Sequence, residues 1–122
     1  MKIAIGTDII EIERIKKIIE SKKEKFLDSM YTEKEREYCE SKNIQKYQSY
    51  AARFAAKEAI YKALSNYINF EYSWKDFEIL NAENGKPEVN LHFKISGLED
   101  LEISISHCKQ YAVAYVTALF KE

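Results

Sequence analysis

The apolar residues at the start of the chain change from a strand-like run to a helical period within a few positions. Residues 3–5 form a short apolar run that Gly6 ends, which predicts a first strand with the carboxylate of Asp8 just beyond its end. From residue 11 to residue 21, isoleucines recur at spacings of three and four, as on the apolar face of an amphipathic helix. We therefore predict a short strand followed closely by a helix, with Asp8 between them.

Two further helices are predicted before the middle of the chain. Residues 32–35 read Thr-Glu-Lys-Glu and have the form of a capping box, in which the Thr hydroxyl and the second Glu carboxylate accept hydrogen bonds from amides at the helix start. This motif predicts a helix from Glu33 to about Asn43. The segment from Tyr47 to about Asn66 is rich in alanine and contains no Gly or Pro, so it predicts a long helix.

The second half of the chain has the period of two that is typical of strands. Asn84-Gly85 is a hairpin-turn signal between residues 77–80 and an alternating segment at residues 89–95. Residues 101–106 alternate again, residues 106–110 predict a turn, and the apolar run 111–120 predicts a buried strand. An N-terminal strand and helices followed by antiparallel β-hairpins, without a repeat or linker, predict a single α+β domain over residues 1–122.

Composition favours a globular protein and argues against several classes. Of the 122 residues, 46% are hydrophobic and 32% are charged, and the formal net charge is -1. The apolar runs are far shorter than the roughly 18 residues that span a bilayer, and no secretory pattern follows Met1, so we expect a cytoplasmic protein without a membrane segment. Cys39 and Cys108 fit neither a disulfide framework nor a zinc site and are expected to be reduced thiols. Scattered tyrosines and a near-zero net charge argue against nucleic-acid binding.

Glu58 is the first candidate for chemistry, because helical spacing places its carboxylate among apolar residues of the long helix. An ionised carboxylate there needs a cation, a metal or hydrogen-bond donors. One interpretation is an ion pair with Lys62, four residues later. The other joins Glu58 to Asp8 as two oxygen donors for a divalent ion such as Mg²⁺, which keeps several waters and takes substrate phosphates.

Basic residues supply two further candidates. Arg53, Lys57 and Lys62 on the long helix, with Lys86 in the turn and His107 between strands, suit a phosphate-rich ligand, although such groups also occur on solvated faces. Residues 14–25 carry six basic and two acidic side chains, a local balance of +4 on the polar face of the first helix.

Four segments, taken in order, resemble the small bacterial holo-[acyl-carrier-protein] synthases, a family of 4′-phosphopantetheinyl transferases. Each segment alone is a weak signal, but the order and the chain length match over almost the whole sequence. The segments are Gly6-Thr7-Asp8-Ile9-Ile10-Glu11-Ile12 with Arg14, Arg53-Phe54-Ala55-Ala56-Lys57-Glu58-Ala59 with Lys62-Ala63-Leu64, Asn84-Gly85-Lys86-Pro87, and Ser104-Ile105-Ser106-His107 with Tyr111-Ala112-Val113-Ala114. Thr32-Glu33 and Tyr38-Cys39 also resemble the family, whereas the aromatic content of residues 67–73 is unusual.

The resemblance implies transfer of the 4′-phosphopantetheine arm from coenzyme A to a serine of apo-acyl carrier protein, with release of adenosine 3′,5′-bisphosphate, in support of fatty acid biosynthesis. It implies that Asp8 and Glu58 hold Mg²⁺ on the pyrophosphate of coenzyme A and that Lys62 neutralises a pyrophosphate oxygen. These three residues are the expected catalytic group. The serine proton would pass to a carboxylate such as Glu58 or to a metal-bound water.

The same resemblance assigns the nucleotide end and the partners. Arg53, Lys86 and His107 are the expected contacts for the 3′-phosphate and nucleotide, and Gly85-Lys86-Pro87 is the segment that the nucleotide approaches. Acyl carrier proteins are acidic, so the basic first helix, and Arg14 first of all, is the expected docking face. The family also implies a homotrimer with active sites between neighbouring subunits.

Two alternatives use the same residues differently. A magnesium-dependent pyrophosphate hydrolase would use Asp8 and Glu58 as ligands and need no carrier protein. A non-catalytic module would bind acidic proteins or nucleic acid through the basic first helix and would need no magnesium. Asp8→Ala abolishes either enzyme and leaves such a binding module intact.

Overall fold

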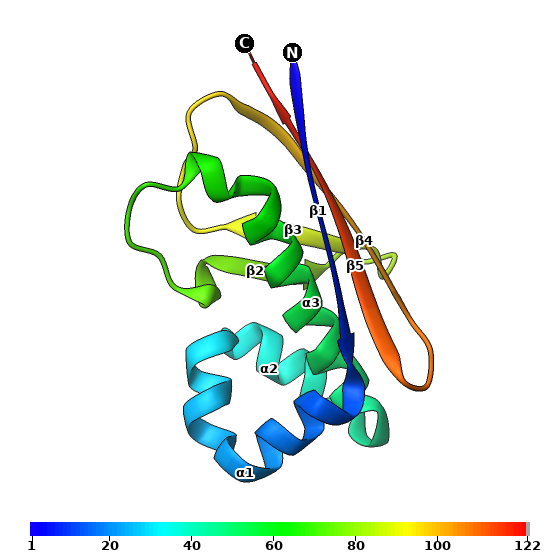
Figure 1. Cartoon of the computed structure of the whole chain (residues 1–122). Coiled ribbons are helices and arrows are strands. Elements are labelled where there is room, and N and C mark those ends of the chain that lie inside the picture. Colours follow the sequence, from blue (N-terminus) through cyan, green and yellow to red (C-terminus); the bar gives the residue numbers. More distant parts are fainter. Residues whose placement is uncertain (122) are drawn as a thin grey trace.

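The chain forms one three-stranded antiparallel sheet, a separate two-stranded hairpin and three helices, as a computed structural model of residues 1–121 shows (Figure 1). The predicted α+β class is confirmed. Three short 3-10 helices connect the longer elements. In chain order the elements are β1 (Lys2–Glu11), α1 (Ile12–Met30), α2 (Glu33–Glu40), η1 (Asn43–Gln45), α3 (Lys46–Leu64), η2 (Ser65–Tyr67), η3 (Trp74–Asp76), β2 (Phe77–Asn81), β3 (Pro87–Leu91), β4 (Leu98–His107) and β5 (Tyr111–Phe120).

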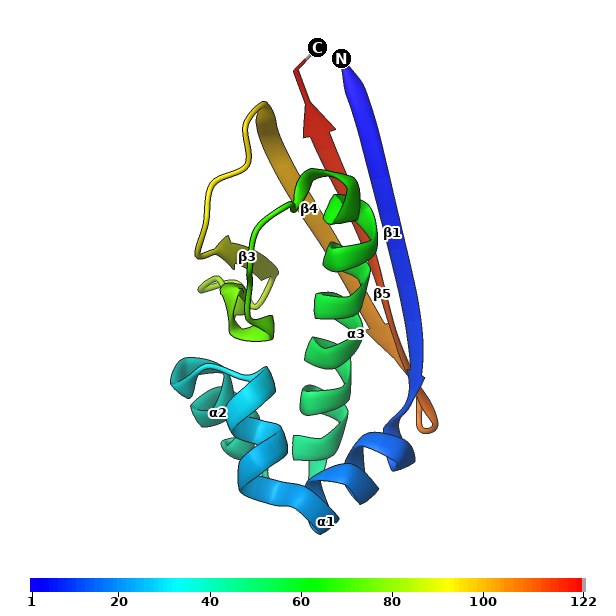
Figure 2. The ribbon, with the colours of Figure 1, turned by 60° about the vertical axis from the view of Figure 1, so that its left-hand side comes forward.

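The sheet has the order β1-β5-β4, so the first strand of the chain lies beside the last. Asp8 pairs with Ala114 on one side of β5, and His107 pairs with Ala112 on the other side. The long helix α3 packs along one face of this sheet, and α1 and α2 gather at the end away from the two termini (Figures 1 and 2). The sheet therefore carries Asp8 and His107 on its two outer strands, on either side of the same central strand.

The first strand is longer than predicted, and Gly6 lies inside it. Gly6 pairs with Val116, and β1 continues through Asp8 to Glu11. A Cβ added at Gly6 would lie 2.0 Å from the carbonyl oxygen of Ala59 in α3. Glycine is needed here because the strand and the helix backbone nearly touch, so the expected break in the strand was wrong and Asp8 is a mid-strand residue.

The first helix also extends beyond its predicted end at residue 21. It runs from Ile12 to Met30 and bends at Lys22, whose φ of -135° and ψ of 40° are not helical. Residues 20–25, which are charged except for Ser21, interrupt the apolar period, and Leu27 and Met30 resume it in the buried core. The prediction stopped where the period broke, whereas the chain bends there and packs a second half-helix against the core.

The other predicted elements are present with shifted ends. The capping box is formed as expected, because Thr32 Oγ1 accepts from the Glu35 amide and Glu35 accepts from the Thr32 amide. Its helix ends at Glu40 rather than near Asn43, which has a positive φ of 55° and starts a 3-10 turn. The hairpin across Gly85 and the strand 111–120 are confirmed, and the strand expected at 101–106 extends from residue 98 to 107.

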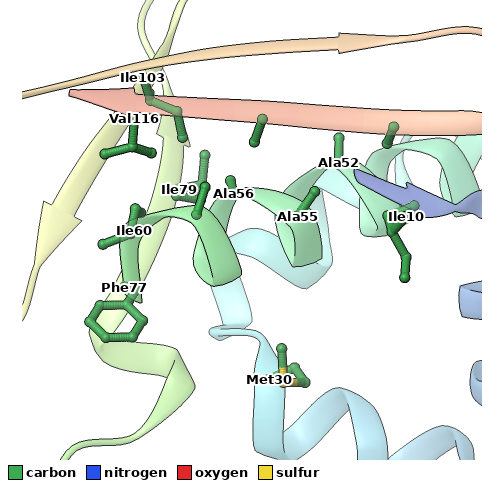
Figure 3. Close-up of a cluster of buried hydrophobic side chains, with 14 of the residues drawn as sticks. Ile10, Met30, Ala52, Ala55, Ala56, Ile60, Phe77, Ile79, Ile103 and Val116 are labelled. Carbon is green, nitrogen blue, oxygen red and sulfur yellow. The ribbon is translucent and has the colours of Figure 1, made fainter. Parts of the chain in front are cut away.

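Alanines let α3 lie close to the sheet. Ala52, Ala55, Ala56 and Ala59 are buried between the sheet and the hairpin, and Figure 3 shows Ala52 and Ala56 facing the strand that carries Val116. Small side chains at three- and four-residue spacing leave room for a backbone-to-backbone approach, which larger residues would prevent. This close packing fixes the position of every functional side chain on α3 relative to β1.

Within residues 1–121, no helix has both the length and the hydropathy that crossing a membrane requires.

Candidate functional site

The candidate residues fall into two clusters on different sides of α3. Arg53 and Glu58 are five residues apart, which at 3.6 residues per turn turns their side chains by about 140° around the helix axis. Glu58 and Lys62, four residues apart, share the side that faces β1. Arg53 instead contacts Asn81 of β2 and Ser49 of its own helix.

Asp8, Glu58 and Lys62 form the first cluster, where β1 crosses α3. The Lys62 ammonium lies 3.1 Å from Asp8 Oδ1 and donates to the backbone carbonyl of Thr7 at 2.9 Å. The pKa of Glu58 is raised, first by burial and then by the negative charge of Asp8, while Lys62 and Arg14 oppose the rise. The close ion pair of Lys62 is thus with Asp8, and the two carboxylates are near enough to repel each other.

The donor set of this cluster fits a magnesium ion. Two carboxylates whose charges repel are stabilised by a cation between them, and Mg²⁺ is commonly held by one or two carboxylates together with waters and substrate phosphates. Within residues 1–121, no group of three or more His, Cys, Asp and Glu side chains is placed to enclose a metal ion. A two-carboxylate site of this kind leaves coordination positions for a phosphate ligand.

Arg14 belongs to the surroundings of the same cluster. It is exposed on the first turn of α1, which follows β1 directly, and its charge lowers the pKa of Glu58. Because α1 begins directly after the strand that carries Asp8, Arg14 is a basic side chain near the carboxylates of β1 and α3.

A second cluster lines a pocket of about 340 Å³ on the other side of α3. Arg53 is only 4% exposed, and its Nε is a buried nitrogen without a hydrogen-bond partner in residues 1–121. A buried, incompletely bonded guanidinium is suited to an anionic ligand. The pocket is lined by Tyr38, Lys42, Gln45, Gln48, Ser49, Ala52, Arg53, Asn81, Gly85, Pro87, Ile105 and His107.

Sequence reasoning found four of these lining residues and missed the rest. Arg53, Gly85, Pro87 and His107 were predicted and do meet at this pocket. Tyr38 was noted only as part of the resemblance. Two cations lie over its ring, the guanidinium of Arg53 at 4.3 Å and the ammonium of Lys42 at 4.6 Å from the ring centre. Lys42 carried no sequence signal, because only the turn after α2 brings it to Arg53.

Two of the predicted cationic residues are placed elsewhere. Lys86 is absent from the lining of the pocket, and its ammonium lies 3.5 Å from Glu102 on β4. Lys57 is completely buried and donates to Glu35 at 2.9 Å, as well as to the carbonyls of Trp74 and Phe77. Burial lowers its pKa and Glu35 opposes that shift, so Lys57 is a structural link between α3, α2 and β2. Its inclusion among the ligand-binding cations was wrong.

Comparison with known proteins shows the family of the chain. Residues 4–116 match the 4′-phosphopantetheinyl transferase superfamily. The chain belongs to this superfamily. The match includes Asp8 and most of β1, all of α3, and all of β4, which ends at His107.

Relatives of this superfamily member cover nearly its whole length. It is 47% identical over 121 residues to the holo-[acyl-carrier-protein] synthase of Ruminiclostridium cellulolyticum, covering 94% of this chain and 90% of that protein. It is 46% identical over 118 residues to the synthase of Chlamydia felis, covering 94% of this chain and 95% of that one. The solved synthase of Bacillus anthracis in complex with CoA (3′,5′-ADP) superposes with a TM-score of 0.80 at 37% identity, covering 97% of this chain and 96% of that chain. The Helicobacter pylori synthase in complex with coenzyme A has a TM-score of 0.77 at 33% identity, with 93% and 98% coverage.

Proposed function

We propose that this protein is a holo-[acyl-carrier-protein] synthase. It transfers 4′-phosphopantetheine from coenzyme A to a serine of apo-acyl carrier protein and releases adenosine 3′,5′-bisphosphate. The observation that carries the proposal is the cluster of Asp8, Glu58 and Lys62, which brings two carboxylates and a cation together where β1 crosses α3. Such a cluster suits the negative charge of a pyrophosphate. The reaction itself is inferred from relatives that are named holo-[acyl-carrier-protein] synthase and match nearly the full chain.

Asp8 and Glu58 hold the magnesium ion in this proposal. When bound, the ion would stabilise negative charge on the pyrophosphate oxygens while the bond from the phosphopantetheine phosphorus to the bridging oxygen breaks and adenosine 3′,5′-bisphosphate leaves with that oxygen. Lys62, whose ion pair with Asp8 is half-exposed, would contact a pyrophosphate oxygen. The serine oxygen would form the new bond to that phosphorus, and its proton would pass to a carboxylate such as Glu58 or to a water.

The nucleotide end of coenzyme A occupies the pocket beside Arg53. The incompletely bonded guanidinium of Arg53 binds the 3′-phosphate, and His107 lines the same pocket. Gly85 has a φ of 87° and no atom within 4 Å of a Cβ built on it, so the backbone of the hairpin turn is open to the nucleotide. We retain Lys86 as a proposed contact, which requires its exposed pair with Glu102 to open.

The two clusters support an active site shared between subunits of a homotrimer. They face different sides of α3 and lie beside opposite outer strands of the sheet, so one molecule of coenzyme A bridges the carboxylates of one chain and the pocket of its neighbour in this proposal. The sheet face turned away from α3 supports contact with a neighbour, because it exposes Ile3, Ile5, Ile9, Tyr111 and Tyr115. Light scattering that gives the mass of a monomer at working concentration would overturn the trimer.

The acidic carrier protein docks on α1 beside the carboxylates. Arg14 is exposed there and close enough to Glu58 to lower its pKa, which places a basic contact next to the reacting groups. Arg14→Glu is expected to raise the KM for the carrier protein and leave the KM for coenzyme A nearly unchanged. Equal effects on both constants would contradict this docking role. We also propose a cytoplasmic location, which two unpaired cysteine thiols support.

The test is the intact mass of an apo-acyl carrier protein incubated with this protein, coenzyme A and Mg²⁺, with and without a chelator. We expect a mass gain of one phosphopantetheine group that the chelator abolishes. Cleavage of coenzyme A without a modified carrier would establish the hydrolase instead. A folded protein that changes neither substrate, beside a carrier shown to be competent with another synthase, would favour the non-catalytic module.

A further inference from the structure

Three aromatic rings pack together beside the carboxylate cluster. We call Tyr61, Tyr72 and Trp74 the aromatic wall. The rings of Tyr61 and Tyr72 are stacked at 5.6 Å, and Trp74 meets each of them edge to face at 5.9 Å. All three residues are half-buried. Such a surface is rigid, apolar and provided with two phenol hydroxyls.

The wall is held in place from behind and from the rest of its loop. Phe77 is completely buried and contacts both Tyr72, at 5.4 Å, and Trp74, at 5.8 Å. Tyr67 stacks on Phe120 at 3.9 Å, which fastens the start of the same connection to the end of the sheet. The unusual aromatic content of residues 67–73 thus fixes the segment between α3 and β2 in one arrangement.

The wall adjoins the side of α3 that carries Glu58 and Lys62. Tyr61 follows Glu58 by three residues, which makes them neighbours on the helix surface. Tyr72 lies within the field of the Glu58 charge, which contributes to the raised pKa of its phenol after burial and the influence of Tyr61. A ligand bound at Glu58 and Lys62 therefore has the aromatic wall beside it.

We propose that the aromatic wall binds the pantetheine arm of coenzyme A during transfer. This inference rests on the proposed function, which leaves the arm as the part of the substrate not yet placed. The proposed function puts the nucleotide end in the Arg53 pocket and the pyrophosphate at Asp8, Glu58 and Lys62, so the arm begins at the carboxylate cluster and extends past it. The wall adjoins that cluster through Tyr61, three residues along α3 from Glu58.

The chemistry of the arm matches the chemistry of the wall. The arm carries a branched dimethyl group that packs on aromatic faces and two amides that bond to phenol hydroxyls. A fixed arm also keeps the phosphoryl group aligned with the carrier serine, because rotation about the arm would turn the phosphorus away. Tyr72 and Trp74 are positioning residues in this account, and Glu58 and Lys62 act on the reacting atoms.

The chain contains one tryptophan, which makes the wall directly observable. Emission of Trp74 is recorded while coenzyme A, or adenosine 3′,5′-bisphosphate, which lacks the arm, is added to the intact protein with Mg²⁺ and no carrier protein. Calorimetry records binding of both ligands in parallel. We expect coenzyme A to change the emission and the bisphosphate to bind without that change. Equal emission changes for the two ligands would overturn the proposal.

Substitutions separate the arm from the nucleotide. Tyr72→Ala is expected to weaken coenzyme A binding about tenfold, the loss of roughly one well-packed aromatic contact, and to leave binding of the bisphosphate within about twofold. Tyr72→Leu keeps a branched apolar side chain in contact with the core and is expected to weaken coenzyme A binding in the same direction. Phe70→Ala is the matched control. Phe70 lies in the same connection between α3 and β2, but it packs on Phe93 and is outside the wall.

The outcomes distinguish this inference from the proposed function. If wild-type protein neither binds coenzyme A nor modifies the carrier, the function fails. If it does both, and the two Tyr72 variants bind coenzyme A like wild type, the wall alone is refuted. A rise in the KM for carrier protein with unchanged coenzyme A binding would assign the wall to the carrier and likewise refute the proposal.

Discussion

Gly6→Ala tests whether the approach of β1 to α3 builds the carboxylate cluster. A Cβ at this position would lie 2.0 Å from the Ala59 carbonyl oxygen and 2.9 Å from the Ala63 amide nitrogen. Both atoms are backbone, so no side-chain rotation relieves the clash. The strand and helix must separate, and they are the two elements that carry Asp8 and Glu58.

The size of the effect follows from the overlap. Contacts of a Cβ with other heavy atoms below 3.0 Å essentially never occur, so the two elements must part locally by about 1 Å. Overpacking of this kind costs about 1–3 kcal/mol of folding free energy, and we expect the upper end because only backbone can yield. Displacement of catalytic groups by about 1 Å lowers kcat/KM by about 100-fold.

The assay combines chemical denaturation with the rate of carrier modification per folded molecule. Gly97→Ala is the control, because Gly97 has a φ of 82°, no backbone clash and a place far along the sheet from Asp8. It should cost about 1–2 kcal/mol of stability through backbone strain alone and keep the activity of the folded fraction. Wild-type activity and stability in Gly6→Ala would refute the close approach, as would rescue by Ala59→Gly, which leaves the opposing carbonyl in place.

Three further predictions concern groups outside the site. Lys57→Met should lower the unfolding free energy by about 3–5 kcal/mol in chemical denaturation, because Glu35 stays buried without its cation, and a loss below about 1 kcal/mol would contradict the buried pair. Burial opposes ionisation of Glu78, but side-chain hydrogen bonds outweigh it and lower its pKa below 4.5, so the unfolded state binds more protons and stability falls as the pH falls through that range. Glu78→Gln should make the stability curve flatter below pH 4.5, and an unchanged slope would count against the lowered pKa. A thiol reagent should modify Cys108 first, since it is exposed and backbone N–H groups lower its pKa, whereas burial raises the pKa of Cys39 to about 11; equal labelling rates by mass spectrometry would be inconsistent with this.

Local patterns predicted the elements whose structure depends on neighbouring residues. The capping box at Thr32, the hairpin turn at Gly85 and the final strand are fixed by hydrogen bonds or alternation within a few positions, and all three are confirmed. The bend at Lys22 and the continuous strand through Gly6 depend on contacts with α3, which no local pattern contains.

The candidate site divides in the same way. Helical spacing placed Glu58 and Lys62 on one face of α3, but only the pairing of β1 with β5 brings Asp8 to them. In the sequence Lys57 resembles its basic neighbours, because its buried ion-pair partner, Glu35, lies 22 residues away. Lys42 was missed because its role also depends on a residue distant in the sequence. It lies over the ring of Tyr38, and only the fold brings Arg53 to the same ring.

The central claim is that each active site combines the carboxylate cluster of one chain with the Arg53 pocket of its neighbour. Asp8→Ala removes one half and Arg53→Met removes the other, and each variant alone should be folded and inactive. The decisive measurement is the carrier-modifying activity of the two variants after subunit exchange in equal amounts. Random mixing restores a complete site at about one quarter of the interfaces in a head-to-tail ring, so about a quarter of wild-type activity is expected. No recovery after proven exchange would show that each chain builds its site alone.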